Sequence, residues 1–386
     1  MTHSAHPSQP LLISFLFFAL DTERGHLYEY NKAVGQAARL AGWEHRAAVR
    51  AAARVAELPP GWELCLGSKR TLMPKGPLAR IERGLRLFFS LTEYLHRQAR
   101  EARPVVLFLE WFDFVHLVPF TLALATVARR ERFDVWIVHR LEADQSLVNR
   151  ANRFLLCCVS ALVQGRMTHL SDSEIVAQDL ARFGYSVHLL PIPHTVPADA
   201  NTGSAPPDPQ HVVAWLPGQA MASKGVEAVR RLTSIRDPNA DTLRVVASEA
   251  SHLVHQPGAC QVVLVPDVLP RIDYVTWMRA ADIILLPYDS ALFRARTSGI
   301  FVEAVVAGKI VVISDDTWMA RQLRQYGLEK LILDWNSPTI ISDLLHVAQA
   351  ADVRVKLALM QSAYADYHSV PGFARTMQHV FDETHK

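Results

Sequence analysis

The chain of 386 residues is 50% hydrophobic and 20% charged, a balance that is typical of a globular protein and excludes a disordered or low-complexity chain. It is too long for one hydrophobic core, so we expect two domains. Forty Lys and Arg residues against 38 Asp and Glu leave a formal net charge of +2, which does not favour nucleic acid as a partner.

The cysteines and the first residues of the chain indicate the cellular compartment in which we expect the protein. The four cysteines form no C-x-x-C pair and no zinc-ligand spacing, and the adjacent Cys157 and Cys158 lie in an apolar stretch typical of buried thiols. The apolar run 11–20 has half the length of a membrane span, and neither a basic segment nor a cleavage site flanks it. We therefore expect a cytoplasmic, reduced protein without a transmembrane helix.

Short apolar runs alternate with helical patterns in the first half of the chain. Strands with two buried faces are expected at 11–19, 44–49, 105–109, 134–138, 167–170 and 187–190. Helices are expected at 28–40, 80–103, 117–129, 147–162 and 173–183. The Pro- and Gly-containing segment 58–77 receives no element.

The alternation stops at 194–210, where Pro, Ala, Asp and Ser dominate without a hydrophobic period, as in a linker. It resumes with strands expected at 211–216, 243–247, 261–265, 282–286, 309–314 and 331–333, helices between them, and further helices at 339–351 and 353–367. We expect an α/β protein with two Rossmann-like, doubly wound domains that face a ligand-binding cleft. The boundaries are 1–195, a linker at 196–210, 211–365, and a segment at 366–386 that returns to the first domain.

A strand, a loop and a helix between 282 and 306 carry the first functional pattern. The loop ends on charged, hydroxyl and small residues, namely Arg294, Arg296, Thr297, Ser298 and Gly299. A helix that opens there offers free amides and a positive dipole to a phosphate. Glu303, one turn into that helix, can accept hydrogen bonds from both hydroxyls of a ribose. The alternative is an ordinary turn in which Glu303 is a favourable first-turn acid.

The second pattern follows the strand at 211–216. Gly218 and Gln219 begin a short loop, and Lys224 with Gly225 stands at the next helix start. A lysine there can neutralise a diphosphate, and such a charge-assisted contact contributes about 1.5–3 kcal/mol. The alternative is a solvated surface lysine.

The two patterns, in this order and some 75 residues apart, contain the texts "GQAMASKG" and "ARTSGIFVEAVVAGKIVV". Together they resemble the C-terminal domain of the retaining GT-B glycosyltransferases of group 1. The resemblance implies two Rossmann-like domains in the GT-B arrangement and an enzyme of hexosyltransferase type in polysaccharide biosynthesis. It implies a nucleotide-diphosphate sugar as donor, bound by the C-terminal domain, and a glycan or lipid-linked acceptor, bound by the N-terminal domain.

The resemblance also implies roles for single residues. Lys224 contacts the donor diphosphate and acts in catalysis, Glu303 holds the nucleotide ribose, and the amides of Thr297–Gly299 line the donor pocket with Gly218. In the N-terminal half, Gly25 and His26 lie in a loop near the donor. His139, at the end of a strand, faces the cleft and contacts the donor sugar as a catalytic residue.

Three positions depart from the pattern of that family. Gln219 stands in place of its arginine, Ala295 in place of the first glutamate of its E-x7-E pair, and Ile310 in place of a proline. We therefore expect Arg294 or Arg296 to supply the positive charge that Gln219 lacks. We expect no cofactor and no metal, because Lys224, a loop arginine and helix amides replace a divalent cation at the departing diphosphate.

Other functions stay open. The substitutions are compatible with a catalytically inactive GT-B subunit that supports an active transferase, or with a sugar-nucleotide epimerase. G-x-G-x-x-G, G-x4-G-K-[ST] and G-x-S-x-G fingerprints are absent from the sequence. The pair Asp315-Asp316 is expected to cap the next helix rather than bind a metal.

The helix at 80–103 has an apolar stripe and many arginines. Ile81, Leu85, Phe88, Leu91, Leu95 and Ala99 form the stripe, which is expected to pack, and Arg83, Arg86, Arg97, Arg100 and Arg103 decorate the rest. Its basic face is either solvated or in peripheral contact with anionic lipid at the inner membrane face, where it would suit a lipid-linked acceptor.

Overall fold

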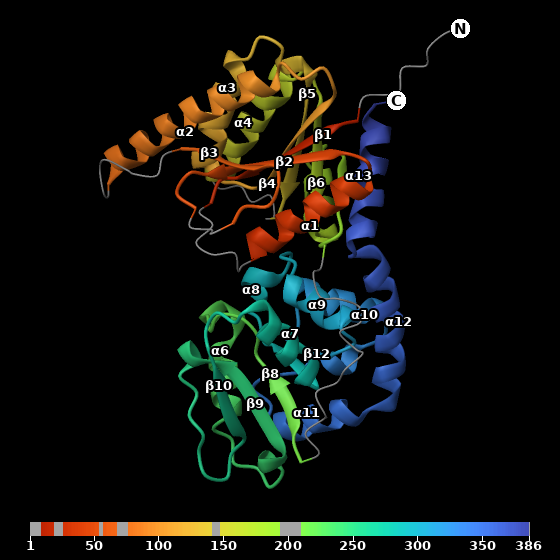
Figure 1. Ribbon diagram of the computed structural model, residues 1–386. Coiled ribbons are helices and arrows are strands. Elements are labelled where there is room, and N and C mark those ends of the chain that lie inside the picture. Colours follow the sequence, from red (N-terminus) through yellow and green to blue (C-terminus); the bar gives the residue numbers. More distant parts are fainter. Residues whose placement is uncertain are drawn as a thin grey trace. The chain divides into compact units, whose positions relative to one another are not determined.

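A computed structural model describes residues 9–18, 26–53, 57–67, 76–140, 147–193 and 210–385. The chain forms two compact units, shown in Figure 1. Unit 1 comprises Met1–Pro193 and Val370–Lys386, and unit 2 comprises His194–Ser369. The linker predicted at 196–210 lies outside the described residues, apart from Gln210.

Unit 1 contains a parallel sheet of the order β3-β2-β1-β4-β5-β6-β7. Its strands are β1 Leu11–Leu16, β2 Glu44–Arg50, β3 Trp62–Leu66, β4 Val105–Trp111, β5 Phe133–His139, β6 Met167–Ser171 and β7 Val187–Leu189. The helices are α1 His26–Leu40, α2 Pro77–Gln98, α3 Phe114–Thr126, α4 Leu147–Leu162, α5 Glu174–Ala181 and α13 Val370–Thr384, with a 3₁₀ turn at Arg130–Arg132.

Successive strand residues of unit 1 enter two different cores, because side chains alternate across a sheet. Leu11, Ile13 and Phe15 pack under α2, α3 and α4. Leu12, on the other face, packs with α1 and α13. Both faces of the sheet are therefore covered, as a parallel sheet requires.

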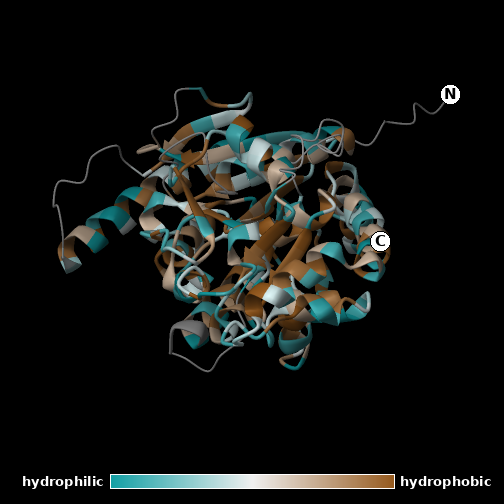
Figure 2. Ribbon diagram, turned by 90° about the horizontal axis from the view of Figure 1, so that it is seen from below, coloured by the Kyte–Doolittle hydropathy of each residue, from teal (hydrophilic) through white to brown (hydrophobic). Residues whose placement is uncertain are grey.

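Unit 2 contains a parallel sheet of the order β10-β9-β8-β11-β12. Its strands are β8 Val212–Trp215, β9 Leu243–Ser248, β10 Gln261–Val265, β11 Ile283–Leu286 and β12 Ile310–Ile313. The helices are α6 Val226–Leu232, α7 Arg271–Ala280, α8 Ser290–Phe293, α9 Gly299–Val306, α10 Trp318–Gln325, α11 Ile340–Gln349 and α12 Ala351–Tyr367, with 3₁₀ turns at Ala222–Lys224, Ala240–Thr242, Glu249–Ser251 and Glu329–Leu331. Figure 2 shows strands in the brown of apolar residues, whereas the helices also carry teal, polar residues.

Each sheet reverses its strand order once. In unit 1 the chain moves outward from β1 through β2 to β3 and then returns to β4 on the other side of β1. In unit 2 the same happens between β8 and β11. Doubly wound sheets bind ligands outside the carboxyl ends of the strands at such switch points. The predicted α/β class with two Rossmann-like domains is confirmed.

Two element predictions are wrong. The segment 58–77, left without an element, contains the edge strand β3, in which only Trp62 and Leu66 are buried. The strand predicted at 331–333 is a 3₁₀ turn followed by a single bridge between Ile313 and Ile332. Both segments are short, so their hydrophobic pattern carries little information.

Two predictions of which side chains are buried are also wrong. Cys157 is exposed and Cys158 half-buried, rather than two buried thiols, because α4 has an outer face there. In α2 the predicted stripe packs only from Phe88 onward, and Ile81 and Leu85 are exposed. In the described part of the chain, no helix is both long and apolar enough to cross a bilayer.

Candidate functional site

The loops that follow β8 and β11 touch at the switch point of unit 2. Gly225 has a φ of +76°, and a Cβ atom there would lie 1.9 Å from the carbonyl oxygen of Pro287, directly after β11. The amide of Asp289 donates to the carbonyl of Ser223 over 3.0 Å. Glycine is required at 225 because the turn that carries Lys224 packs against the backbone at the end of β11.

Lys224 extends from this turn toward Gly218. Its Nζ lies 3.5 Å from the position that a Cβ of Gly218 would take, and Cδ1 of Ile300 lies at the same distance from that position. Burial lowers the pKa of the Lys224 ammonium. Among the described residues no carboxylate pairs with it. A half-buried cation of this kind is suited to an anionic ligand.

The amino end of α9 borders the same space, because Ile300 belongs to its first turn. The Ser298 hydroxyl caps the helix by accepting from the amide of Phe301 over 3.3 Å. It also contacts the Tyr288 hydroxyl, whose pKa burial raises to about 12. Ser298 is therefore a helix cap, and the amides of Gly299 and Ile300 are the groups offered to a ligand.

Glu303 is fixed by two side chains that the sequence analysis missed. The Tyr274 hydroxyl donates to its Oε2 over 2.7 Å, and Arg271 Nη1 lies 3.6 Å from its Oε1. The Tyr274 ring packs edge-on against Trp215 at the end of β8, with centroids 5.3 Å apart. Nη2 of Arg271 is buried without a hydrogen bond. Arg271 and Tyr274 stand three positions apart at the start of α7, a spacing that places both on one helix face.

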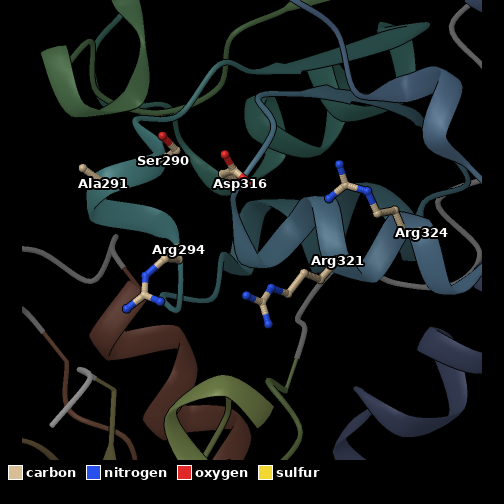
Figure 3. Close-up of a pocket in the computed structure, with 6 residues that line it drawn as sticks. All are labelled: Ser290, Ala291, Arg294, Asp316, Arg321 and Arg324. Carbon is tan, nitrogen blue, oxygen red and sulfur yellow. The ribbon is translucent and has the colours of Figure 1, made fainter. Parts of the chain in front are cut away.

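The other residues predicted in unit 2 lie at its surface. Gln219, Arg294 and Arg296 are exposed, and Thr297 is half-buried. Arg294, at the end of α8, lines a hollow with Arg321 and Arg324 of α10, as Figure 3 shows. Arg324 Nη2 lies 2.6 Å from Asp315 Oδ1. Thr317, rather than either aspartate, caps α10.

His139 lies in unit 1, at the carboxyl end of β5. Its Nε2 is 2.9 Å from Nδ1 of His169 on β6, and the rings are stacked. Burial, with a smaller contribution from His169, lowers the pKa of His139 to about 3. His139 is therefore a neutral imidazole. Gly25 lies outside the described residues, and His26 begins α1 but its side chain is not described.

A buried charge cluster at the carboxyl ends of β4, β5 and β6 was also missed. Arg140 Nη2 lies 2.9 Å from Glu110 Oε1, and its Nε lies 3.4 Å from Asp172 Oδ2. Asn31 of α1 donates to Glu110 Oε2 over 2.8 Å. Burial raises the pKa of Glu110 to about 7 although the guanidinium opposes this shift. The apolar run in which Glu110 stands was the only sequence signal of its burial.

Several solved structures share this fold over almost the whole length of the chain. Sucrose-phosphate synthase from Thermosynechococcus elongatus is 14% identical, with a TM-score of 0.63 over 97% of this chain and 98% of that chain. A trehalose-6-phosphate protein from E. coli, solved bound with UDP-2-fluoro glucose, is 13% identical, with a TM-score of 0.64 over 98% of this chain and 99% of that chain. A trehalose-6-phosphate synthase studied for glycosyl transfer with retention is 12% identical, with a TM-score of 0.63 over 97% of this chain and 99% of that chain.

No protein-family model and no curated protein sequence matches the chain. At 10–14% identity the structural likeness establishes the fold. The predicted GT-B fold is confirmed, because these structures share it over almost their entire length.

Proposed function

We propose that the chain is a glycosyltransferase that moves a sugar, with retention, from a nucleotide-diphosphate sugar to a glycan or lipid-linked acceptor. The observation that carries this proposal is the position of Lys224. Its half-buried ammonium and the amino end of α9 border one space at the switch point of unit 2. A pyrophosphate needs this combination of a cation and free amides.

Each group of the proposed donor site has a separate task. Lys224 and the amides of Gly299 and Ile300 stabilise the charge that develops on the departing diphosphate. Glu303, oriented by Tyr274 and Arg271, accepts the ribose hydroxyls. The neutral His139 of unit 1 contacts the donor sugar, and unit 1 binds the acceptor. The reaction proceeds without a metal ion, since Lys224 supplies the charge.

A thermal-shift series with UDP, GDP, ADP and their sugars tests the donor site. One nucleotide diphosphate at a hundred times its Kd should stabilise the protein by about 2.7 kcal/mol. For a unit of this size that raises Tm by roughly 5 to 10 °C. Uridine, guanosine and adenosine without phosphate serve as controls. An unchanged Tm with every nucleotide diphosphate would contradict the proposed donor site.

The same assay identifies the residue that supplies the positive charge which the group-1 pattern has at the position of Gln219. We propose that Arg294 or Arg296 supplies it, since both belong to the loop between α8 and α9. Arg294→Ala or Arg296→Ala should then weaken binding of the best diphosphate. Full affinity in both variants would remove this assignment.

The inactive-subunit alternative rests on Ala295, which is buried where the group-1 pattern has a glutamate. Binding of a nucleotide sugar without transfer to any glycan, and without slow hydrolysis, would favour that alternative. Transfer of labelled sugar by the purified chain would exclude it.

We further propose that α2 holds the protein at an anionic membrane surface, which places the enzyme beside a lipid-linked acceptor. Four large apolar side chains of α2 are 53–65% exposed, namely Leu78, Ile81, Leu85 and Phe89. Their spacing of three and four residues puts them on one face of the helix. Arg80 and Arg83 are exposed on the same turns. An exposed apolar stripe with arginines beside it is typical of a helix that lies in a lipid interface.

Vesicle sedimentation tests this contact. The protein should bind phosphatidylcholine vesicles that contain phosphatidylglycerol, and Arg80→Gln with Arg83→Gln should weaken binding by about 2 kcal/mol, or roughly thirtyfold. Leu85→Ser with Phe89→Ser should abolish it. Leu359→Ser, which removes an equally exposed leucine from α12, is the matched control and should bind normally. Equal binding to neutral vesicles, or none to either kind, would contradict the proposal.

A further inference from the structure

The switch point of unit 1 carries an exposed tryptophan. Leu16 of β1 pairs with Trp111 of β4, whereas Ser14 pairs with Phe108, so β4 contains one extra residue between the two pairs. Bulges of this kind redirect side chains and occur next to binding sites. Every residue of β4 before the last is buried, including Glu110, and Trp111 is 45% exposed. The bulge therefore presents one large ring at the place where a doubly wound sheet binds its ligand.

Neighbouring groups fix the orientation of this ring. Phe18, just after β1, meets it edge-on with centroids 5.9 Å apart. The Arg140 guanidinium lies 5.7 Å from the Trp111 ring and 5.0 Å from the Tyr30 ring. Arg140 is itself held by Glu110 and Asp172. Because anchored groups hold the Trp111 ring from two sides, the ring is already ordered before a ligand binds. Stacking of a ligand on it therefore costs little conformational entropy.

The polar groups around Trp111 carry both charges, since Arg140 lies over its ring and Arg50 acts electrostatically on His116, the partner of Asp113. The Asp113 carboxylate, two residues further on, is 53% exposed and lies 2.8 Å from His116 Nδ1. Glu110 and Asp172 pair with the Arg140 guanidinium and offset its charge. The surroundings therefore offer a carboxylate acceptor for hydroxyl groups, while the cation is already balanced by two acids. At Asp113 an uncharged hydroxyl is favoured over a phosphate, because the carboxylate accepts from the hydroxyl and repels the anion.

From this arrangement we propose that Trp111, with Phe18 and Asp113, forms the binding site for the ring of a neutral hexose. The C–H face of a pyranose stacks on the indole, and its hydroxyls donate to the Asp113 carboxylate. Identification of that hexose as the acceptor rests on the proposed glycosyl transfer. The hexose is either a free glycoside or the headgroup of a glycolipid, since both present the same ring.

Saturation-transfer NMR on the full chain tests this site. The probes are methyl glucoside, methyl galactoside and methyl mannoside, glucose 6-phosphate as the anionic counterpart, and octyl glucoside for a lipid-borne ring. At least one neutral hexoside should receive saturation, and glucose 6-phosphate should bind more weakly than methyl glucoside. Stronger binding of octyl glucoside than of methyl glucoside would assign the ring to a lipid, and equal binding to a free sugar. In both cases a neutral hexose occupies the site.

Four variants identify the residues. Trp111→Ala should weaken hexoside binding roughly tenfold or more, while Trp111→Phe, which keeps a ring, should retain part of it. Asp113→Asn should also weaken it. Phe154→Ala, which removes an exposed ring from α4, is the matched control and should bind like the original protein. Circular dichroism and Tm show whether each variant is folded.

Three results would overturn the proposal: unchanged binding in folded Trp111→Ala, tighter binding of glucose 6-phosphate than of methyl glucoside, or no saturation of any hexose. The nucleotide thermal shift depends on unit 2. A protein that responds to a nucleotide diphosphate but to no hexose would therefore contradict this site alone.

Discussion

Lys224→Ala is expected to weaken binding of the preferred nucleotide diphosphate by about 1.5–3 kcal/mol, or roughly 10- to 150-fold. The reason is that the variant removes the half-buried ammonium, which no carboxylate among the described residues neutralises. The departing diphosphate carries more charge in the transition state than in the bound donor, so turnover should fall further, by roughly 100- to 1000-fold. Isothermal titration with the diphosphate and a transfer assay with labelled donor measure the two effects.

A nucleoside without phosphate separates this effect from damage to the fold. Its affinity should be the same in Lys224→Ala and in the original protein, because the ammonium is assigned to the diphosphate alone. Lys330→Ala is the matched control, since Lys330 lies in the same unit and pairs with Asp352 over 2.8 Å at the surface. If folded Lys224→Ala binds the diphosphate with full affinity, the proposed donor site is wrong.

Arg140→Met is expected to destabilise unit 1 by about 3–5 kcal/mol at pH 8. The guanidinium lies against both Glu110 and Asp172, and its loss removes a positive charge from beside two buried carboxylates. Urea unfolding measures the loss. Because the two units can unfold in separate transitions, the free energy of unfolding is taken from the transition of unit 1 alone, in the variant and in the original protein. Arg166→Met is the control, since Arg166 is 40% exposed and its partner Asp134 also contacts His385.

The pH dependence of the free energy of unfolding tests the charge state of Glu110 in the same buried cluster. The pKa of Glu110 is raised from its ordinary value of 4.5 to about 7, so the folded state binds more protons than the unfolded state between these values. Glu110 therefore contributes a loss of stability as pH rises through this window, of about 3 kcal/mol in total. The difference in unfolding free energy between the original protein and Glu110→Gln isolates this contribution. A difference that stays constant from pH 4.5 to 7.5 would contradict the raised pKa.

Much of the architecture follows from hydrophobic periodicity. Residues 147–162 form α4 with the predicted bounds, because their apolar positions recur at helical spacing over four turns. The edge strand β3 was missed because it buries only Trp62 and Leu66, and two residues do not define a period. In α2 the apolar stripe is continuous along the sequence, but only its second half packs against other described residues. Periodicity identifies an apolar face and does not show what covers it.

The candidate site was predictable where the chain itself supplies the geometry. Lys224, Gly225, Ser298 and Gly299 stand at helix starts, and their residue types indicate the turns that they form. Tyr274 and Arg271 were not predictable, because their contact with Glu303 depends on how α7 packs beside α9. The bulge that exposes Trp111 and buries Glu110 depends on the register between β1 and β4, which no local pattern encodes.

Unit 2 is inserted between β7 and α13 of unit 1, and this topology bears on how the protein is made. The ribosome delivers all of His194–Ser369 before it delivers α13. During that interval Tyr30, Val34 and the other α1 side chains that pack against α13 have no cover. The inserted unit can fold while it is being synthesised, but its host must wait for the last helix. A nascent chain stalled within unit 2 should therefore expose an apolar surface that chaperones recognise, and this surface should disappear when α13 leaves the exit tunnel.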